Sequence, residues 1–337
     1  MTLFGHDGQI AEFRRAMDSG KLHHAWLLSG PRGIGKRSFA DMAALRLLAV
    51  AAGPAPATGD LNVEPDHPTA KLIAAHSHPD FRVLTRPPKD KTERRKPLDE
   101  RNPDAELARN IPIELVRSLD ALFGNTPSLS DRRAVIIDAI DDLERSGANA
   151  LLKNLEEPPP KSVFLLICHN PGRILPTIRS RCRMLKFAPL DDDAMTSALK
   201  AAEPELSDSE IAALIAAGQG APGQALAYAG LDVAGLDAAI SALIGEGDPS
   251  NARRSELAQS LALKKEAKRY EVFLRRAPQA IADHAKRLHG RPMADAIAKW
   301  EEARSLASGA LPLSLDPQST VFTLAGMLAS LHEPRHG

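Results

Sequence analysis

Cysteine and aromatic residues are scarce in this sequence. Cys168 and Cys182 are the only two cysteines among 337 residues. Two thiols cannot build a disulfide framework or a four-thiolate zinc site, and such low usage is typical of a reducing compartment. Aromatic residues make up 4% of the chain, which is too few for a single-strand nucleic-acid platform built on base stacking.

The chain also lacks an excess of charge and a long apolar run. Its 43 Lys and Arg residues balance 43 Asp and Glu residues, which argues against a basic coat for nucleic acid over the whole protein. The most apolar stretch, 42–57, is interrupted by Arg46 and two prolines, so we expect no membrane-spanning helix. The first residues do not form a signal-peptide pattern. These features predict a soluble, cytoplasmic protein.

The first half of the chain contains short apolar runs without polar alternation. Such runs are typical of strands covered on both faces in a parallel sheet, and they occupy residues 25–29, 81–85, 134–138, 163–169 and 184–187. Helical patterns lie between them, at 7–19, 36–50, 111–123 and 142–157. Strands that alternate with helices indicate βαβ units. We therefore predict an α/β domain with a parallel sheet flanked by helices over residues 1–189.

After residue 189 the strand-like runs stop and helical patterns continue to the end. The length already favours two or three domains. Two short helices are expected at 191–202 and 207–217, followed by a turn at 218–223 and another helix from Gln224. We therefore predict a small helical domain over 190–231 and a larger all-α domain over 232–337.

Two charged segments each allow two interpretations, as a solvent-exposed segment or as a nucleic-acid-binding one. Residues 86–110 hold four prolines and Arg94-Arg95-Lys96, which favours an exposed, mobile loop over a nucleic-acid-binding one. Residues 264–291 hold nine basic and three acidic residues. We interpret them as a solvated helix face with four apolar side chains turned inward, and a basic groove for DNA is the alternative. The four are Leu261, Leu263, Phe273 and Ile281.

A phosphate-binding loop follows the first predicted strand. The segment from Gly30 to Lys36 has the spacing Gly-x4-Gly-Lys and stands between a strand and a helix, which is the context that this motif requires. Glycines let successive backbone N–H groups curl around an anion, and a helix N-terminus adds partial positive charge. The candidate nucleotide-binding residues are Gly30, Gly33, Gly35, Lys36 and Asp138.

Two substitutions indicate that this site does not hydrolyse nucleotide. Arg37 stands where a Ser or Thr hydroxyl would coordinate magnesium, and Ser38 lies about 100° further around the helix. Ala139 follows Asp138 at the position of the catalytic carboxylate, while Asp141 lies beyond the strand end. Both changes affect positions that coordinate magnesium or orient the attacking water in an active ATPase. We predict that the chain needs no cofactor and has no independent ATPase activity. Whether the loop still binds ATP or phosphate is left open.

Three sequence blocks resemble a known family. They are His23 to Lys36, Asn149-Ala-Leu-Leu-Lys-Asn-Leu-Glu-Glu-Pro-Pro159 and Ser180-Arg-Cys-Arg183, in that order. Together they resemble the clamp-loader branch of the AAA+ ATPases, and within it the delta-prime subunits of bacterial DNA polymerase III. His78-Pro-Asp-Phe81 and Gly220-Ala-Pro-Gly-Gln-Ala-Leu226 strengthen the resemblance, which is strong over residues 3–226.

The resemblance implies an architecture, partners and a role for one arginine. It implies a RecA-like P-loop domain, a helical lid and a C-terminal collar that joins subunits into a hetero-pentameric ring. The implied partners are gamma/tau and delta subunits, with the sliding clamp and primer-template DNA reached through the complex. Arg181 would act as a catalytic arginine in trans, neutralising charge at the γ-phosphate in a neighbouring subunit. Ser180 and Cys182 would pack and cap rather than react.

The chain departs from the family's pattern at three places. The segment 51–77 carries no cysteine, and three histidines alone (His67, His76 and His78) do not make a tetrahedral structural site, so we predict no zinc and place them on a surface segment. Gly223 stands where motor subunits have a lid arginine. The fourth strand ends in His169-Asn170 instead of a plain Thr or Asn sensor.

Three functional hypotheses follow from these residues. The first is a non-hydrolysing clamp-loader subunit that acts through protein contacts and Arg181. The second is a gamma/tau-like motor ATPase, against which Arg37, Ala139 and Gly223 count. The third is a stand-alone P-loop kinase, which the helical domains and the 149–159 block disfavour.

Overall fold

The computed structural model describes residues 2–57 and 59–332, and these form two compact units. The first unit comprises the chain up to residue 198 together with 220–223, and the second comprises 199–219 together with the chain from 224 onward. The predicted domain borders after residues 189 and 231 stay predictions. Residues 333–337 of the predicted last domain lie outside the described part.

The first unit is built on a five-stranded parallel sheet with the order β2-β3-β4-β1-β5, which confirms the predicted α/β class. Each strand lies within about one residue of its predicted run, and the strands are β1 (Ala25–Ser29), β2 (Phe81–Thr85), β3 (Arg133–Asp138), β4 (Ser162–Cys168) and β5 (Arg183–Lys186). The central strand β4 is buried along its whole length, whereas the edge strands β2 and β5 are partly exposed. Burial on both faces is why the central runs are continuously apolar.

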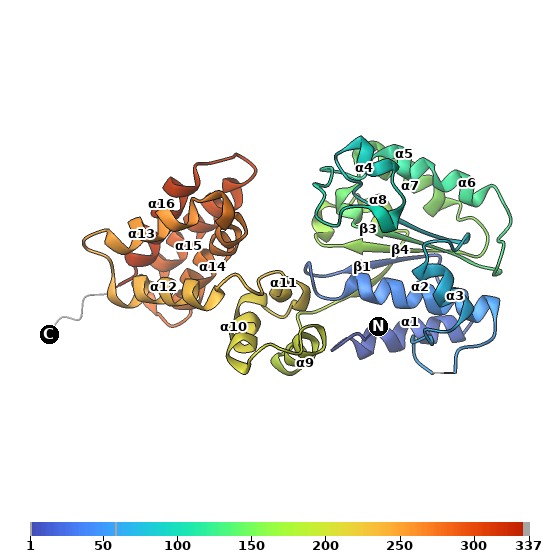
Figure 1. Ribbon diagram of the computed structural model, residues 1–337, viewed down its shortest axis with the longest axis horizontal. Coiled ribbons are helices and arrows are strands. Elements are labelled where there is room, and N and C mark those ends of the chain that lie inside the picture. The colour runs from blue at the N-terminus through green and yellow to red at the C-terminus, as the bar shows by residue number, and fades with distance from the viewer. Residues whose placement is uncertain (1, 58, 333–337) are drawn as a thin grey trace. The chain divides into compact units, whose positions relative to one another are not determined.

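Helices cover both faces of this sheet (Figure 1). One face carries α1 (Asp7–Asp18), α2 (Lys36–Ala52) and α3 (Pro68–Ala74), and the other carries α5 (Ile113–Arg117), α6 (Leu119–Phe123), α7 (Arg145–Glu156) and α8 (Pro176–Arg179). Successive strand residues alternate between the faces: Trp26 and Leu28 are buried in the first core, and Leu27 in the second. The single helix predicted over 111–123 is divided into α5 and α6.

The parallel arrangement gives the sheet two chemically distinct edges. Because all strands run the same way, their carboxyl ends meet at one edge. The loops after β1, β3 and β4 therefore lie together, and this brings Gly30, Asp138 and His169 to one place in the fold. Residues that precede strands lie at the opposite, amino edge.

The segment 86–110, predicted as an exposed, mobile loop, is mostly exposed but contains regular structure, and its mobility stays a prediction. It forms the short helix α4 (Lys91–Arg95) and a 3-10 turn (Leu98–Glu100). An antiparallel bridge joins Pro88 to Leu107. This bridge brings the two ends of the segment together, as in a hairpin.

The rest of the chain is helical, as predicted. Its helices are α9 (Asp192–Ala202), α10 (Asp208–Gly218), α11 (Pro222–Leu226), α12 (Val233–Glu246), α13 (Ala252–Leu261), α14 (Ala267–Ala285), α15 (Gly290–Ala310) and α16 (Pro317–Ala329). Helix α16 contacts α12, α13, α14 and α15, and it buries Val321, Leu324 and Leu328. No helix in the described part of the chain is both long and apolar enough to cross a membrane.

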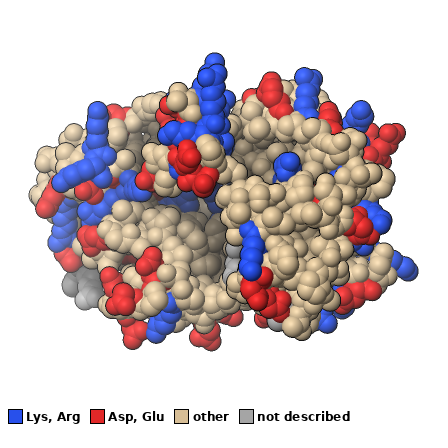
Figure 2. Space-filling model, turned by 45° about the vertical axis from the view of Figure 1, so that its right-hand side comes forward, with Lys and Arg blue, Asp and Glu red and all other residues tan. Residues whose placement is uncertain are grey.

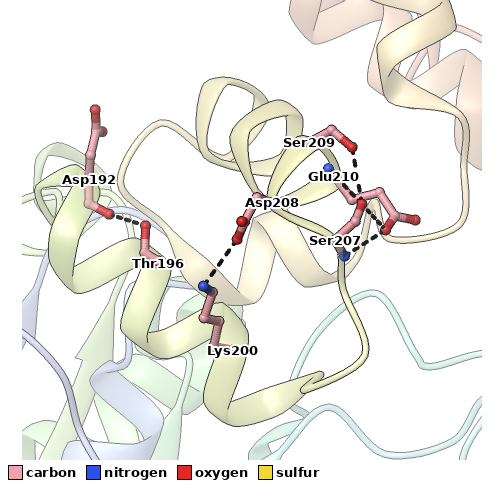
Figure 3. Close-up of polar contacts among 7 residues, drawn as sticks. All are labelled: Asp192, Thr196, Lys200, Ser207, Asp208, Ser209 and Glu210. Atoms are coloured by element: carbon pink, nitrogen blue, oxygen red, sulfur yellow. Dashed lines mark hydrogen bonds and ion pairs between the residues drawn. The ribbon is translucent and has the colours of Figure 1, made fainter.

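Local polar contacts define the start of α10 (Figure 3). The Ser207 hydroxyl accepts from the backbone N–H of Glu210, and the Glu210 carboxylate accepts from the backbone N–H of Ser207. This capping box satisfies N–H groups that a helix end leaves unpaired. Lys200 on α9 lies 3.1 Å from Asp208 on α10, and the pair links the two helices.

The basic segment 264–291 is largely a helix face, as predicted. Leu261, Phe273 and Ile281 are buried, but Leu263 is 51% exposed, so that part of the prediction is wrong. Arg276 forms two hydrogen bonds with Asp237 on α12, each 2.8 Å long. On the face drawn in Figure 2, basic side chains lie interspersed with acidic ones. Contact between this segment and DNA stays a prediction.

Candidate functional site

The phosphate-binding loop is shaped by close packing as much as by glycine flexibility. Gly33 and Gly35 have φ values of 78° and 105°, in the left-handed region that disfavours side chains. Gly30 is required for another reason: a Cβ there would lie 2.4 Å from the carbonyl oxygen of Phe187. His6 contributes a contact that the sequence did not reveal, because its Nε2 lies 2.8 Å from the carbonyl oxygen of Ile34.

Lys36 is turned onto its own loop. Its side chain is buried, and Nζ donates to the carbonyl oxygens of Gly30 at 2.6 Å and Pro31 at 2.5 Å. Burial lowers the pKa of Lys36 to about 8, because a charged amine is disfavoured away from water. Gly30, Gly33, Gly35 and Lys36 thus form one site. A phosphate group would have to draw the lysine away from these two carbonyl groups.

Replacing Lys36 by methionine is expected to stabilise the chain by about 1 kcal/mol at pH 7. A pKa lowered from 10.5 to about 8 corresponds to roughly 3 kcal/mol of cost for the charged form, offset by about 1 kcal/mol for each lost hydrogen bond. The unfolded chain binds more protons than the folded chain between these pH values, so wild-type stability rises there.

The advantage of Lys36→Met should therefore shrink as the pH rises from 8 towards 10. Urea unfolding at pH 7 and pH 9.5 measures it, with the exposed Lys21→Met as the matched control. A constant difference between wild type and Lys36→Met across this range would contradict the lowered pKa of the buried lysine.

Arg37 lies between two carboxylates of the candidate site. Its Nε is 2.9 Å from Asp41 and its Nη1 is 3.3 Å from Asp138. Asp138 therefore reaches the predicted site, where one of its carboxylate oxygens is paired with the Arg37 guanidinium. Burial raises the pKa of Asp41, although the neighbouring Arg37 opposes this shift. Asp41 was missed in the sequence, where its i,i+4 spacing from Arg37 was the available signal.

The carboxylates that follow β3 do not replace the missing catalytic group. Ala139 is buried and has no polar side chain. The Asp141 carboxylate accepts from the backbone N–H of His169 at 2.7 Å and of Asn170 at 2.8 Å, so it fixes the end of β4. Burial and the nearby Lys36 lower the pKa of His169. Its Nδ1 has no partner in the described part of the chain.

The first turn of α11, which holds Gly223, rests directly on the phosphate-binding loop. The backbone N–H of Gly223 donates to the carbonyl oxygen of Gly33 at 2.8 Å. A Cβ at Gly223 would lie 3.0 Å from that oxygen and 3.2 Å from the Gly33 Cα. A long side chain at position 223, such as the arginine expected in motor subunits, would require the turn to move away from the loop.

Arg181 lies at the amino edge of the sheet, away from the carboxyl-edge loop. It precedes β5, which is parallel to its neighbour β1. Its Nη1 donates to the carbonyl oxygen of Thr177 at 2.9 Å, and its Nη2 lies 2.8 Å from a carboxylate oxygen of Glu156. The side chain is 35% exposed. The fold therefore does not bring Arg181 together with the loop of the same chain.

The cysteines and histidines near these segments have structural surroundings. Burial raises the pKa of Cys168 and of Cys182 to about 12, so both stay as thiols, which are weak nucleophiles. Placing the three histidines on the surface was wrong for His67 and His78, which are buried. His67 accepts from the backbone N–H of Thr69 and caps α3.

Within residues 2–57 and 59–332, no three His, Cys, Asp or Glu side chains are arranged to hold a metal ion. The expectation of no zinc stays a prediction.

Comparison with known proteins places these features in a family. The chain is 38% identical to DNA polymerase III subunit delta' of Pseudomonas aeruginosa over 159 residues, covering 47% of this chain and 41% of the relative. It is 28% identical to the same subunit of Haemophilus influenzae, covering 64% and 56%. DNA polymerase III subunit gamma of Buchnera aphidicola is 32% identical, covering 54% and 42%. The chain thus spans about half the length of these curated relatives.

The match to the family itself covers more of the chain. The sequence profile described as DNA polymerase III, delta subunit, matches residues 5–191, which include the whole sheet, the phosphate-binding loop and Arg181. This is more than half of the 337 residues. The chain therefore belongs to the DNA polymerase III delta subunit family.

Proposed function

We propose that the chain is a delta-prime-type subunit of the bacterial DNA polymerase III clamp loader, and that it does not hydrolyse ATP itself. It would join gamma/tau and delta subunits in a hetero-pentameric ring. Through that complex it would help to place the sliding clamp on primer-template DNA. Its family membership and its likeness to subunits delta' and gamma support these partners.

The observation that carries the absence of hydrolysis is the position of Arg37. Catalysis of phosphoryl transfer requires a magnesium ion near the β- and γ-phosphates, held by a hydroxyl and an acidic side chain. The guanidinium of Arg37 pairs with Asp138 and Asp41 instead. The positive charge there repels a divalent cation, and the guanidinium competes with that cation for the carboxylate oxygens of Asp138 and Asp41.

Arg181 supports a role in trans. Since it lies at the sheet edge opposite the loop, it serves no nucleotide bound in its own chain. Its partial exposure and its single surface carboxylate partner leave it available to another subunit. Such a surface ion pair contributes only about 0–1 kcal/mol, which a stronger contact with a γ-phosphate would readily replace.

A gamma/tau-like motor is the second candidate, favoured by the identity with subunit gamma. Three features count against it: Arg37 on the carboxylates, Ala139 in place of a catalytic carboxylate, and Gly223 packed on Gly33. The discriminating measurement is ATP hydrolysis by the purified chain with magnesium and primed DNA. We expect no turnover above background, with a gamma/tau subunit as the positive control. Turnover of about 1 s⁻¹ or more, within the usual enzyme range, would establish the motor instead.

A further inference from the structure

A pocket lies at the amino edge of the sheet, opposite the phosphate-binding loop. Its volume is about 700 Å³, and its lining includes residues 123–131, Arg133 and Lys161. Asp80, Arg133 and Ser162 begin or immediately precede β2, β3 and β4 and lie in register across the three strands. Nothing in the proposed ATP chemistry uses this edge pocket.

Arg133 is the unusual residue of this pocket. It is 3% exposed, yet its guanidinium forms no ion pair with any carboxylate of residues 2–57 and 59–332. Its Nη2 donates to the carbonyl oxygen of Asn125, and its Nε has no partner in that part of the chain. A buried charge without a counter-ion is strongly disfavoured, so the arrangement calls for an anion.

The nearby carboxylates are already engaged. Asp80 accepts from the backbone N–H groups of Ser128, Leu129 and Ser130, at 2.9, 2.9 and 3.3 Å. These bonds hold the lining loop in a fixed shape. Asp131 pairs with Lys161 at 2.6 Å. Neither carboxylate forms an ion pair with Arg133 in the described residues.

Other hydrogen-bond donors accompany the guanidinium. Thr126 and Ser128 are exposed residues of the lining with hydroxyl groups. The hydroxyl of Ser162, next to Arg133 across the strands, is buried without a partner in the described residues. A guanidinium with neighbouring hydroxyls suits a small oxyanion, because its planar fork binds two oxygen atoms of a phosphate or carboxylate at once.

We propose that this amino-edge pocket binds a small oxyanion, a phosphate or a carboxylate group, through Arg133. The test is thermal unfolding of the full chain in phosphate, acetate and chloride at equal ionic strength. Phosphate or acetate should raise the unfolding midpoint over chloride by about 5 °C at roughly one hundred times Kd. The anion that raises the midpoint shows whether the pocket takes a phosphate or a carboxylate.

Arg133→Met should abolish this shift, whereas the neighbouring Arg132→Met, which lies outside the pocket lining, should keep it. General salt effects would raise the unfolding midpoints of all variants equally. An equal shift of the midpoint in Arg133→Met and in wild type would therefore overturn the proposal. A measurement without substitution guards against a misfolded variant: wild-type crystals soaked in selenate should show an anomalous peak beside the Arg133 guanidinium. If that peak is absent and neither phosphate nor acetate raises the wild-type midpoint over chloride, the proposal is likewise overturned.

Discussion

Replacing Arg181 by alanine is expected to lower ATP turnover at the neighbouring motor subunit by about 10³-fold or more. The experiment uses a reconstituted complex in which only that neighbour keeps its phosphate-loop lysine, so one active site is observed. In the proposed role, the guanidinium would stabilise charge that develops in the transition state. The KM for ATP should therefore change much less than kcat. Assembly should persist, since the Glu156 pair that is lost is a surface contact.

Two variants of the same segment sharpen this test. Arg179→Ala removes an exposed arginine two residues earlier and should leave turnover unchanged. Arg181→Lys should restore little, because an ammonium lacks the planar fork that binds two phosphate oxygens. If Arg181→Ala left the single-site kcat unaltered in an intact complex, the role in trans would be wrong.

Replacing Arg37 by threonine is expected to make the loop bind Mg·ATP at least tenfold more tightly than the wild type does. The change removes the cation that competes with magnesium, frees Asp138 and Asp41, and supplies the missing hydroxyl. Calorimetric titration with ATP, with and without magnesium, measures it. The gain should require magnesium, because the added hydroxyl acts through the metal. Hydrolysis should stay at background, since Ala139 remains in place of the catalytic carboxylate.

The matched control for this prediction is Arg32→Thr. It makes the same substitution within the loop at an exposed residue that has no ion pair in the described structure. If both variants gained the same affinity for Mg·ATP, loss of positive charge in general would explain the effect. If Arg37→Thr gained nothing with magnesium, Arg37 would not be what keeps the metal away.

The strands could be predicted because their burial requires continuous apolar runs, which are visible in the sequence. A central parallel strand is buried on both faces, so β1 and β4 are apolar without alternation. The break between α5 and α6 left no such trace, since apolar spacing continues through Ser118. The hairpin-like closure of 86–110 was also missed, because it depends on a bridge between residues 19 apart in sequence, Pro88 and Leu107.

The site was predicted in its chemistry but not in its contacts. Residue identity alone excludes magnesium coordination by Arg37 and base catalysis by Ala139. It does not say where the guanidinium of Arg37 goes. The roles of His6 and Asp141 depend on which loops the fold brings together, since their partners are 28 and 29 residues away along the chain.

The amino-acid sequence by itself determined the sheet-forming segments, the glycine-rich loop and the loss of its hydroxyl, because these are properties of short stretches and single side chains. Only the tertiary structure decided that Arg37 lies on two carboxylates, that Gly223 rests on Gly33, and that Arg181 lies at the edge opposite the loop. These facts follow from strand order and from packing between distant segments, which burial and steric exclusion set for the folded chain as a whole.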